Sequence, residues 1–204
     1  MKSRPIVTLT AALAALGYLR ARQPLLTWGA TQAEASGALP GDGLLPAADG
    51  MSTRAIDIAA PPADVWPWIA QMGPAPRGGA YTYDWIENLL GLNMHSVDSV
   101  LPEFQHPHVG DTIELGSNRM RLELVEPAEA LAWRSEDRNW VWAFYLVDRG
   151  DSTRLISRNR FHLPSPLARA AMLPMEPASL LMERRMLREI KRLSEELATK
   201  APVR

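Results

Sequence analysis

The sequence predicts an α+β domain in which a curved antiparallel sheet wraps around a long C-terminal helix, with two short helices beside the sheet. Strand-like runs follow one another with only short turns across residues 97–163, and strands joined in this way pair antiparallel. Residues 177–198 form the one long stretch with helical periodicity. Only this final helix is long enough to cover the concave face of such a sheet.

Composition narrows the class of protein. The chain has 204 residues, an apolar content of 47%, a net charge of −1, seven tryptophans and no cysteine. This length is enough for one domain with additional segments. The near-zero charge gives no general attraction to nucleic acid, and the lack of cysteine excludes disulfides and thiolate chemistry. Many large rings in a short chain fill a core or line a cavity for a bulky apolar ligand.

The first 26 residues form a separate apolar segment. The run 5–19 is apolar apart from two threonines, and basic residues flank it on both sides. It is shorter than the roughly 20 residues that span a bilayer comfortably. A signal sequence, a short anchor and an amphipathic helix docked on the domain all fit it. Membrane association through residues 5–19 is therefore one hypothesis, and a membrane-associated or a cytoplasmic location both stay open.

Residues 27–50 are predicted to be an irregular lead-in, because glycine and proline are frequent in their second half. The compact domain is placed at 51–200. Its first strand covers 53–58, and Pro61 and Pro62 then open a short helix that Gly73 ends. Pro67 should bend this helix. A second short helix is predicted over 83–90.

The sheet is then built from five further runs. They are residues 109–115, 120–124, 131–134, 140–147 and 153–163. The run 140–147 is apolar on both faces and should be a central strand. In the last run, Ser157 and Asn159 share a face with apolar residues; if this face is the inner one, they are polar groups in an apolar pocket. Trp142 and Phe144 would then belong to the same wall, although the two-sided apolarity of their strand leaves this open.

The final helix carries an apolar stripe on one side and a basic flank on another, and we interpret the flank as a solvated face. The stripe comprises Leu180, Met186, Leu187, Ile190, Leu193 and Leu197. A helix lying across a concave sheet meets it imperfectly, so a cavity is expected between the two. Met186 is predicted to face it.

Several strings in this order of elements resemble the SRPBCC superfamily, the START, birch-pollen-allergen and polyketide-cyclase-like helix-grip proteins, and an uncharacterised bacterial subgroup in particular. The strings are Trp28-Gly29-Ala30-Thr31 with Glu34, Val65-Trp66-Pro67-Trp68-Ile69 with Gln71-Met72-Gly73, Arg77-Gly78-Gly79 with Tyr81 to Asn88, Leu101-Pro102-Glu103, and Met182 to Leu187. The resemblance implies a helix-grip fold in a bacterial protein. It does not imply one activity, because the superfamily includes lipid carriers, hormone receptors and cyclases.

The segment 77–88 is the candidate site. A Gly-Gly pair allows a close backbone approach, and aromatic and acidic residues follow within one short helix. In a functional interpretation Arg77, Tyr81, Tyr83 and Trp85 line the mouth of the cavity. Asp84 or Glu87, with Tyr83, would then be the candidate catalytic group.

In a structural interpretation, which we favour because structural ion pairs resemble functional sites, Arg77 pairs with Asp84 or Glu87 and the rings fill the core. The four histidines are scattered and lack the spacing of a zinc motif. Phosphate-binding and dinucleotide-binding fingerprints are absent from the sequence. We therefore expect no metal and no cofactor.

The resulting functional hypothesis is the binding of a small hydrophobic or amphipathic ligand, such as a lipid, a polyketide or an aromatic metabolite. One alternative is a cyclase or dehydratase that uses the Tyr81–Glu87 cluster. Another is a membrane-attached accessory protein. Whether the protein is an enzyme stays open.

Overall fold

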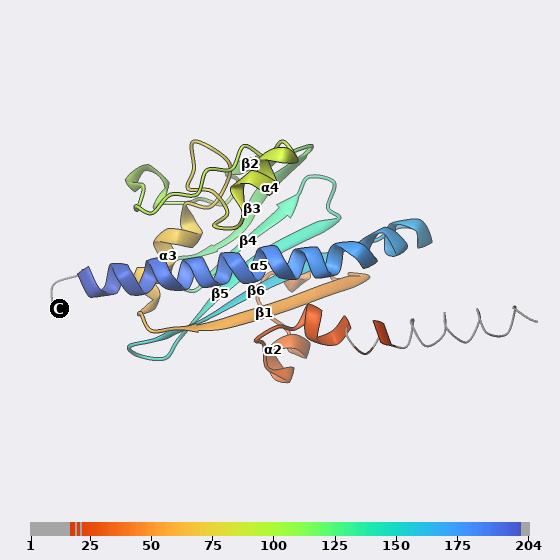
Figure 1. Ribbon diagram of the computed structural model, residues 1–204, viewed down its shortest axis with the longest axis horizontal. Coiled ribbons are helices and arrows are strands. Elements are labelled where there is room, and N and C mark those ends of the chain that lie inside the picture. The colour runs from red at the N-terminus through yellow and green to blue at the C-terminus, as the bar shows by residue number, and fades with distance from the viewer. Residues whose placement is uncertain (1–16, 19, 21, 201–204) are drawn as a thin grey trace, which may run out of the picture.

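A computed structural model describes residues 17, 18, 20 and 22–200, and its sheet has six antiparallel strands (Figure 1). The strands are β1 (Gly50–Ile58), β2 (Thr112–Leu115), β3 (Asn118–Glu126), β4 (Ala130–Ser135), β5 (Trp140–Asp148) and β6 (Thr153–Phe161). Their spatial order is β1-β6-β5-β4-β3-β2, so the first strand pairs with the last. This order follows from the short hairpins between β2 and β6, because each strand lies beside the next in sequence.

The helices are α2 (Gln32–Ser36), α3 (Pro62–Ala70), α4 (Asp84–Leu89) and α5 (Pro166–Lys200), with two 3₁₀ turns, η1 (Asp42–Leu44) and η2 (Pro102–Phe104). Figure 1 shows α5 running across the whole sheet, with α3 and α4 on one side of it and α2 near β1. The predicted α+β class, a curved antiparallel sheet around a long C-terminal helix, is confirmed.

Two predicted boundaries are wrong. The long helix begins at Pro166 rather than at Pro177, and Pro174 and Pro177 lie inside it. The side chain of Ser165 accepts a hydrogen bond from the backbone N–H of Ala168, so a serine cap and a proline in the first turn start the helix. The stretch 97–111, predicted to be strand-like, holds η2 and turns, and β2 begins only at Thr112.

The inner face of the sheet forms the main core with α5. Trp142 pairs with Asn159 and Phe144 with Ser157 in the β5–β6 register, which places all four on the inner face. The stripe residues at the centre of α5 close this core from the other side: Met186, Leu187, Ile190 and Leu193, each at most 3% exposed. The predicted stripe therefore faces the sheet.

The outer face of the sheet is covered by the lead-in rather than by solvent. Small residues such as Ala132 and Ala143 lie on this face and pack against Leu39 and Leu44. Arg154, Arg158 and Arg160 of β6 donate hydrogen bonds to carbonyl oxygens along the lead-in: Gly29, Glu34, Gly37, Leu45 and Pro46. Arginine suits this role because its guanidinium group carries five donors and can satisfy an irregular backbone.

Candidate functional site

A cavity of about 370 Å³ lies between the sheet and the middle of α5, and we call it the inner chamber. Its residues come from strands β1, β2, β3, β5 and β6, from helices α4 and α5, and from the loops beside α4. They are Ser52, Arg54, Ala80, Thr82, Glu87, Leu92, Met94, Leu115, Asn118, Trp140, Trp142, Asn159, Phe161, Ser179, Met182, Glu183 and Met186. The wall is mostly apolar, with a few polar groups, which is the composition typical of small-molecule sites.

Aromatic rings form one wall of this chamber. Trp140 stacks on Trp142 on one side and on Phe161 on the other, each with ring centroids 6.1 Å apart and planes 15° apart. The indole N–H of Trp140 donates to Asn159 Oδ1 over 2.9 Å, and that of Trp142 donates to Ser157 Oγ over 3.2 Å. The polar edges of both indoles are therefore satisfied by the sheet, and their rings remain available as apolar surface.

A buried ion pair lies beside this wall. The guanidinium of Arg54, whose side chain is fully buried, donates to Glu183 Oε2. Glu183 Oε1 also accepts from Ser157 Oγ at 2.5 Å and from Asn159 Nδ2 at 3.0 Å. Burial lowers the pKa of Arg54 to about 10, which still leaves it charged at neutral pH. The pair is neutral as a whole, and neighbouring groups satisfy the carboxylate.

Glu87 presents a different kind of acid to the inner chamber. The residue is 7% exposed, and its Oε2 has no hydrogen-bond partner among the described residues. The hydroxyl of Thr82, which also lines the chamber, is equally without a partner in the described part of the chain. Burial raises the pKa of Glu87, and Asp84 adds to this rise; the Thr82 hydroxyl lies close enough to the carboxyl group to oppose it, although the two do not meet the geometry of a hydrogen bond. Two residues of the chamber wall thus carry buried oxygens that no described residue satisfies.

Arg77 lies outside the inner chamber and pairs with neither acid, so the predicted ion pair to Asp84 or Glu87 is wrong. Its guanidinium donates to the backbone oxygens of Met72 at 2.8 Å and Ala70 at 2.6 Å. It also lies over the ring of Phe104, 4.7 Å from the centroid. The side chain instead satisfies carbonyl groups at the end of α3.

The other residues of the predicted site are spread over three environments. Tyr81 is buried in the core, where it accepts a hydrogen bond from Gln71 Nε2 at 2.9 Å, and burial raises its pKa above the usual range. Tyr83 is half-buried under the guanidinium of Arg185, 5.9 Å from its ring centroid. Trp85 is 69% exposed on α4. None of the three lines the inner chamber.

Asp84 and the Gly-Gly pair hold the loop together. Asp84 accepts hydrogen bonds from the backbone N–H and the hydroxyl of Ser96, at 2.7 and 2.6 Å. Gly79 has a φ of +79°, and a Cβ there would lie 2.6 Å from the Cα of Ser96. The close approach that the glycines permit is therefore to the loop around Ser96.

Three of the residues predicted to bind a ligand line the inner chamber: Trp142, Asn159 and Met186. Of the two candidate catalytic acids, Glu87 also lines it. Phe144 and Ser157 lie on the same inner face without lining it: Phe144 packs against Trp142, with ring centroids 4.9 Å apart, and Ser157 supports its indole. Sequence reasoning missed Arg54 and Glu183. An arginine on the apolar face of β1 was the available signal for the first of them.

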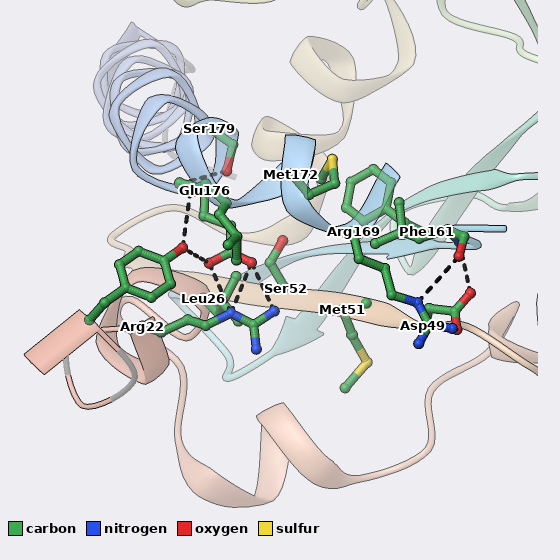
Figure 2. A pocket seen from close by; sticks show the side chains of 14 residues that line it. Arg22, Leu26, Asp49, Met51, Ser52, Phe161, Arg169, Met172, Glu176 and Ser179 are labelled. Atoms are coloured by element: carbon green, nitrogen blue, oxygen red, sulfur yellow. Dashed lines mark hydrogen bonds and ion pairs between the residues drawn. The ribbon is translucent and has the colours of Figure 1, made fainter. Parts of the chain in front are cut away.

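A second cavity of about 690 Å³, which we call the outer chamber, adjoins the inner one (Figure 2). It lies between Tyr18, Arg22 and Leu26 on one side and the start of β1, the end of β6 and the first half of α5 on the others. Its lining residues are Tyr18, Arg22, Leu26, Asp49, Gly50, Met51, Ser52, Phe161, Leu163, Arg169, Met172, Leu173, Glu176 and Ser179. Ser52, Phe161 and Ser179 line both chambers.

The described residues hold no group of three or more potential metal ligands. Within the same residues, no helix is both long and apolar enough to cross a membrane. Residues 1–16, which include most of the apolar run 5–19, lie outside the described part of the chain.

Comparisons with known proteins give distant structural matches. A Polyketide_cyc-like protein from Corynebacterium glutamicum is 18% identical, with 76% of this chain and 97% of that chain covered and a TM-score of 0.41. A START superfamily protein from Mycobacterium smegmatis is 14% identical, with 70% and 98% covered and a TM-score of 0.42. A protein from Rhodobacter sphaeroides is 18% identical, with 74% and 93% covered and a TM-score of 0.44.

No family model and no curated protein matches the chain. The chain's own strand order, and the position of α5 across the concave face, show that it has the helix-grip fold.

Proposed function

We propose that this protein binds a small hydrophobic or amphipathic molecule in the inner chamber. The observation that carries the proposal is the combination, in one cavity of about 370 Å³, of stacked indole rings with two polar groups that lack partners in the described chain. Apolar surface supplies most of the affinity of such a site, and a few polar groups orient the ligand. A buried polar group without a partner is costly, so a ligand that hydrogen-bonds to Glu87 and Thr82 gains affinity.

The ordered wall also supports a binding role. Trp140 and Trp142 are held by hydrogen bonds to Asn159 and Ser157, and these two side chains are held in turn by Glu183. A wall fixed in this way loses little conformational freedom when a ligand arrives. We expect the ligand to lie along the ring faces, with its polar end toward Glu87.

Two measurements test this proposal. Native mass spectrometry of protein purified from its own host should show a copurifying small molecule, and the neutral fluorescent probe N-phenyl-1-naphthylamine should bind the emptied protein. Met182→Trp, which adds a large ring to the inner chamber, should weaken probe binding at least tenfold. Leu181→Trp is the matched control, because Leu181 is the adjacent α5 residue and is 54% exposed. Absence of any copurifying molecule together with no probe binding would refute the proposal.

Glu87 favours one second candidate, a dehydratase-like or cyclase-like activity. A buried carboxyl group with a raised pKa can act as a general acid near neutral pH, and Glu87 faces a cavity of ligand size. Among the other candidate catalytic residues, Asp84 is occupied by Ser96 and Tyr83 lies outside the chamber. Glu87 is therefore the residue on which this activity would depend.

The enzymatic candidate needs a separate test. The wild-type protein would be incubated with the N-acetylcysteamine thioester of 3-hydroxyoctanoate, and the mixture would be followed by mass spectrometry for the loss of one water. An enzyme should give the enoyl thioester, and Glu87→Gln should give none while still binding the fluorescent probe. Equal product from both proteins would remove Glu87 from the chemistry, and no product from either would contradict activity on this substrate class.

A further inference from the structure

The two chambers are adjacent and share part of their walls. Ser52, Phe161 and Ser179 line both of them, and the stacked row from Phe161 to Trp140 and Trp142 leads from the outer into the inner chamber. Figure 2 shows Phe161 and Ser52 beside the outer chamber, between the Glu176 and Asp49 clusters. A ligand that reaches Phe161 from the outer side therefore meets a continuous aromatic surface that leads inward.

The charged groups of the outer chamber are already paired with each other. Glu176 accepts hydrogen bonds from Tyr18 at 2.7 Å and from Arg22 Nε at 2.9 Å. At the other end, Arg169 lies 2.6 Å from Asp49. Between these clusters the wall is apolar and includes Leu26, Met172 and Leu173 (Figure 2 labels the first two). This chamber suits a hydrocarbon chain.

The inner chamber differs from the outer one because two of its polar groups are unpaired. Thr82 Oγ1 and Glu87 Oε2 lack hydrogen-bond partners within the described residues, whereas the charge of Arg54 is balanced by Glu183. An anionic head would be placed beside Glu87 with no uncompensated cation among the lining residues, which is an unfavourable burial of charge. An uncharged hydroxyl or carbonyl oxygen can hydrogen-bond to these groups without that cost.

We infer that both chambers form one site for a single-chain amphiphile, with an uncharged hydroxyl or carbonyl head beside Glu87 and its hydrocarbon chain in the outer chamber. This inference rests on the proposed function of the inner chamber and extends it. It gives the ligand a direction, with its head toward α4 and its chain toward Tyr18, Arg22 and Leu26. It also predicts that affinity depends on chain length, because each methylene that enters the outer chamber is removed from water.

The test is a displacement series with N-phenyl-1-naphthylamine as the probe. Straight-chain 1-alkanols from hexanol to tetradecanol should displace the probe from the wild-type protein, with affinity rising roughly fourfold for each added methylene until the chain fills the outer chamber. Alkanoates of the same lengths, measured at pH 8, should bind at least tenfold more weakly than the alkanols. Alkanoates that bind as tightly as alkanols would overturn the assignment of an uncharged head.

Met172→Trp adds a ring to the outer chamber. In this variant the rise of alkanol affinity with alkyl length should stop at a shorter alkanol, while hexanol should still bind as in the wild type. Leu163→Trp, on the loop after β6, is a second block at the same chamber in case the first variant does not fold, which melting followed by circular dichroism would show. Leu167→Trp is the control, since Leu167 lies on α5, is 78% exposed and lines neither chamber.

The outcomes separate this inference from the function on which it rests. If hexanol binds but affinity does not rise with chain length, or if both blocked variants match the wild type, the role of the outer chamber is refuted and the inner site stands. If neither the probe nor any alkanol binds, and native mass spectrometry finds no ligand, both are refuted.

Discussion

At the scale of single residues, two glutamates of one cavity are in opposite states. Glu183 accepts hydrogen bonds from Arg54, Ser157 and Asn159, whereas Glu87 has an oxygen without any partner in the described chain. The first is a structural group, because neighbouring donors satisfy its charge. The second has a hydrogen-bonding oxygen that no described residue uses. Residue type alone does not distinguish them, since the partners come from distant strands.

Glu87→Gln should make the protein more stable at high pH. Because burial raises the folded-state pKa of Glu87, any stabilisation from this group is present below its unfolded pKa and is lost as pH rises through the folded value. The neutral amide does not undergo this loss. The melting temperature of Glu87→Gln should exceed that of the wild type by roughly 2–4 °C at pH 8, and the difference should vanish near pH 4. A difference that is constant across this range would show that ionisation is not involved.

At the scale of elements, the lead-in behaves as a cover for the outer face of the sheet. Thr31 and Glu34 form a capping box at the start of α2, with Thr31 N–H donating to Glu34 at 2.7 Å. The same carboxylate accepts two hydrogen bonds from Arg154 of β6, at 2.9 and 2.8 Å. One side chain thus starts a short helix and fastens it to the sheet, which a five-residue helix needs because it is not stable alone.

Glu34→Gln should weaken this attachment in a pH-dependent way. Hydrogen bonds from Arg154 lower the pKa of Glu34 from 4.5 to about 2. Its stabilisation is therefore complete above about pH 5 and is lost as pH falls from there toward 2. The variant should lose about 1 kcal/mol at pH 7, after allowance for solvent screening at a partly exposed pair, and only a small part of that at pH 2. Urea unfolding at both pH values measures this, with the exposed Glu103→Gln as control; an equal loss at both would contradict it.

At the scale of the whole molecule, Arg54 joins three distant parts of the chain. From β1 it donates to Glu183 and Ser179 on α5 and, over 3.1 and 2.9 Å, to the backbone oxygen of Leu25. Arg184 and Arg188 of α5 lie over the ring of Trp28, so they also hold the N-terminal segment against α5. Strand, C-terminal helix and N-terminal segment are thereby held around the boundary between the two chambers.

Replacing either partner of the Arg54–Glu183 ion pair should destabilise the protein, and the two losses in the free energy of unfolding should not add. Arg54→Met leaves Glu183 buried without its cation, and Glu183→Gln leaves Arg54 without its anion, so each should lower the free energy of unfolding by about 3–5 kcal/mol. The double variant removes both charges and should lose much less than the sum. A double-mutant cycle in urea measures the coupling. Strictly additive losses would show that the pair does not act as a unit.

The sequence by itself determined the α+β class, the stripe of α5 and the approximate positions of the strands. These depend on local periodicity, which a single chain displays directly. The start of α5 was predicted too late, at residue 177, although Ser165 and Pro166 carry the signal of a serine cap followed by a first-turn proline. Arg154, Arg158 and Arg160 alternate along β6 and so share one face of it, but no local pattern indicates which segment covers that face.

Only the tertiary structure decided which polar groups meet. Glu183 lies 129 positions from Arg54 and 26 positions from Ser157 along the chain, yet the three side chains form one buried network. Arg77 and Glu87 are close in sequence and do not pair, because Arg77 hydrogen-bonds to backbone oxygens at the end of α3. Local patterns fix which face of an element is apolar, whereas the partner of a polar group depends on long-range packing. The two chambers between sheet and α5 are a product of that packing.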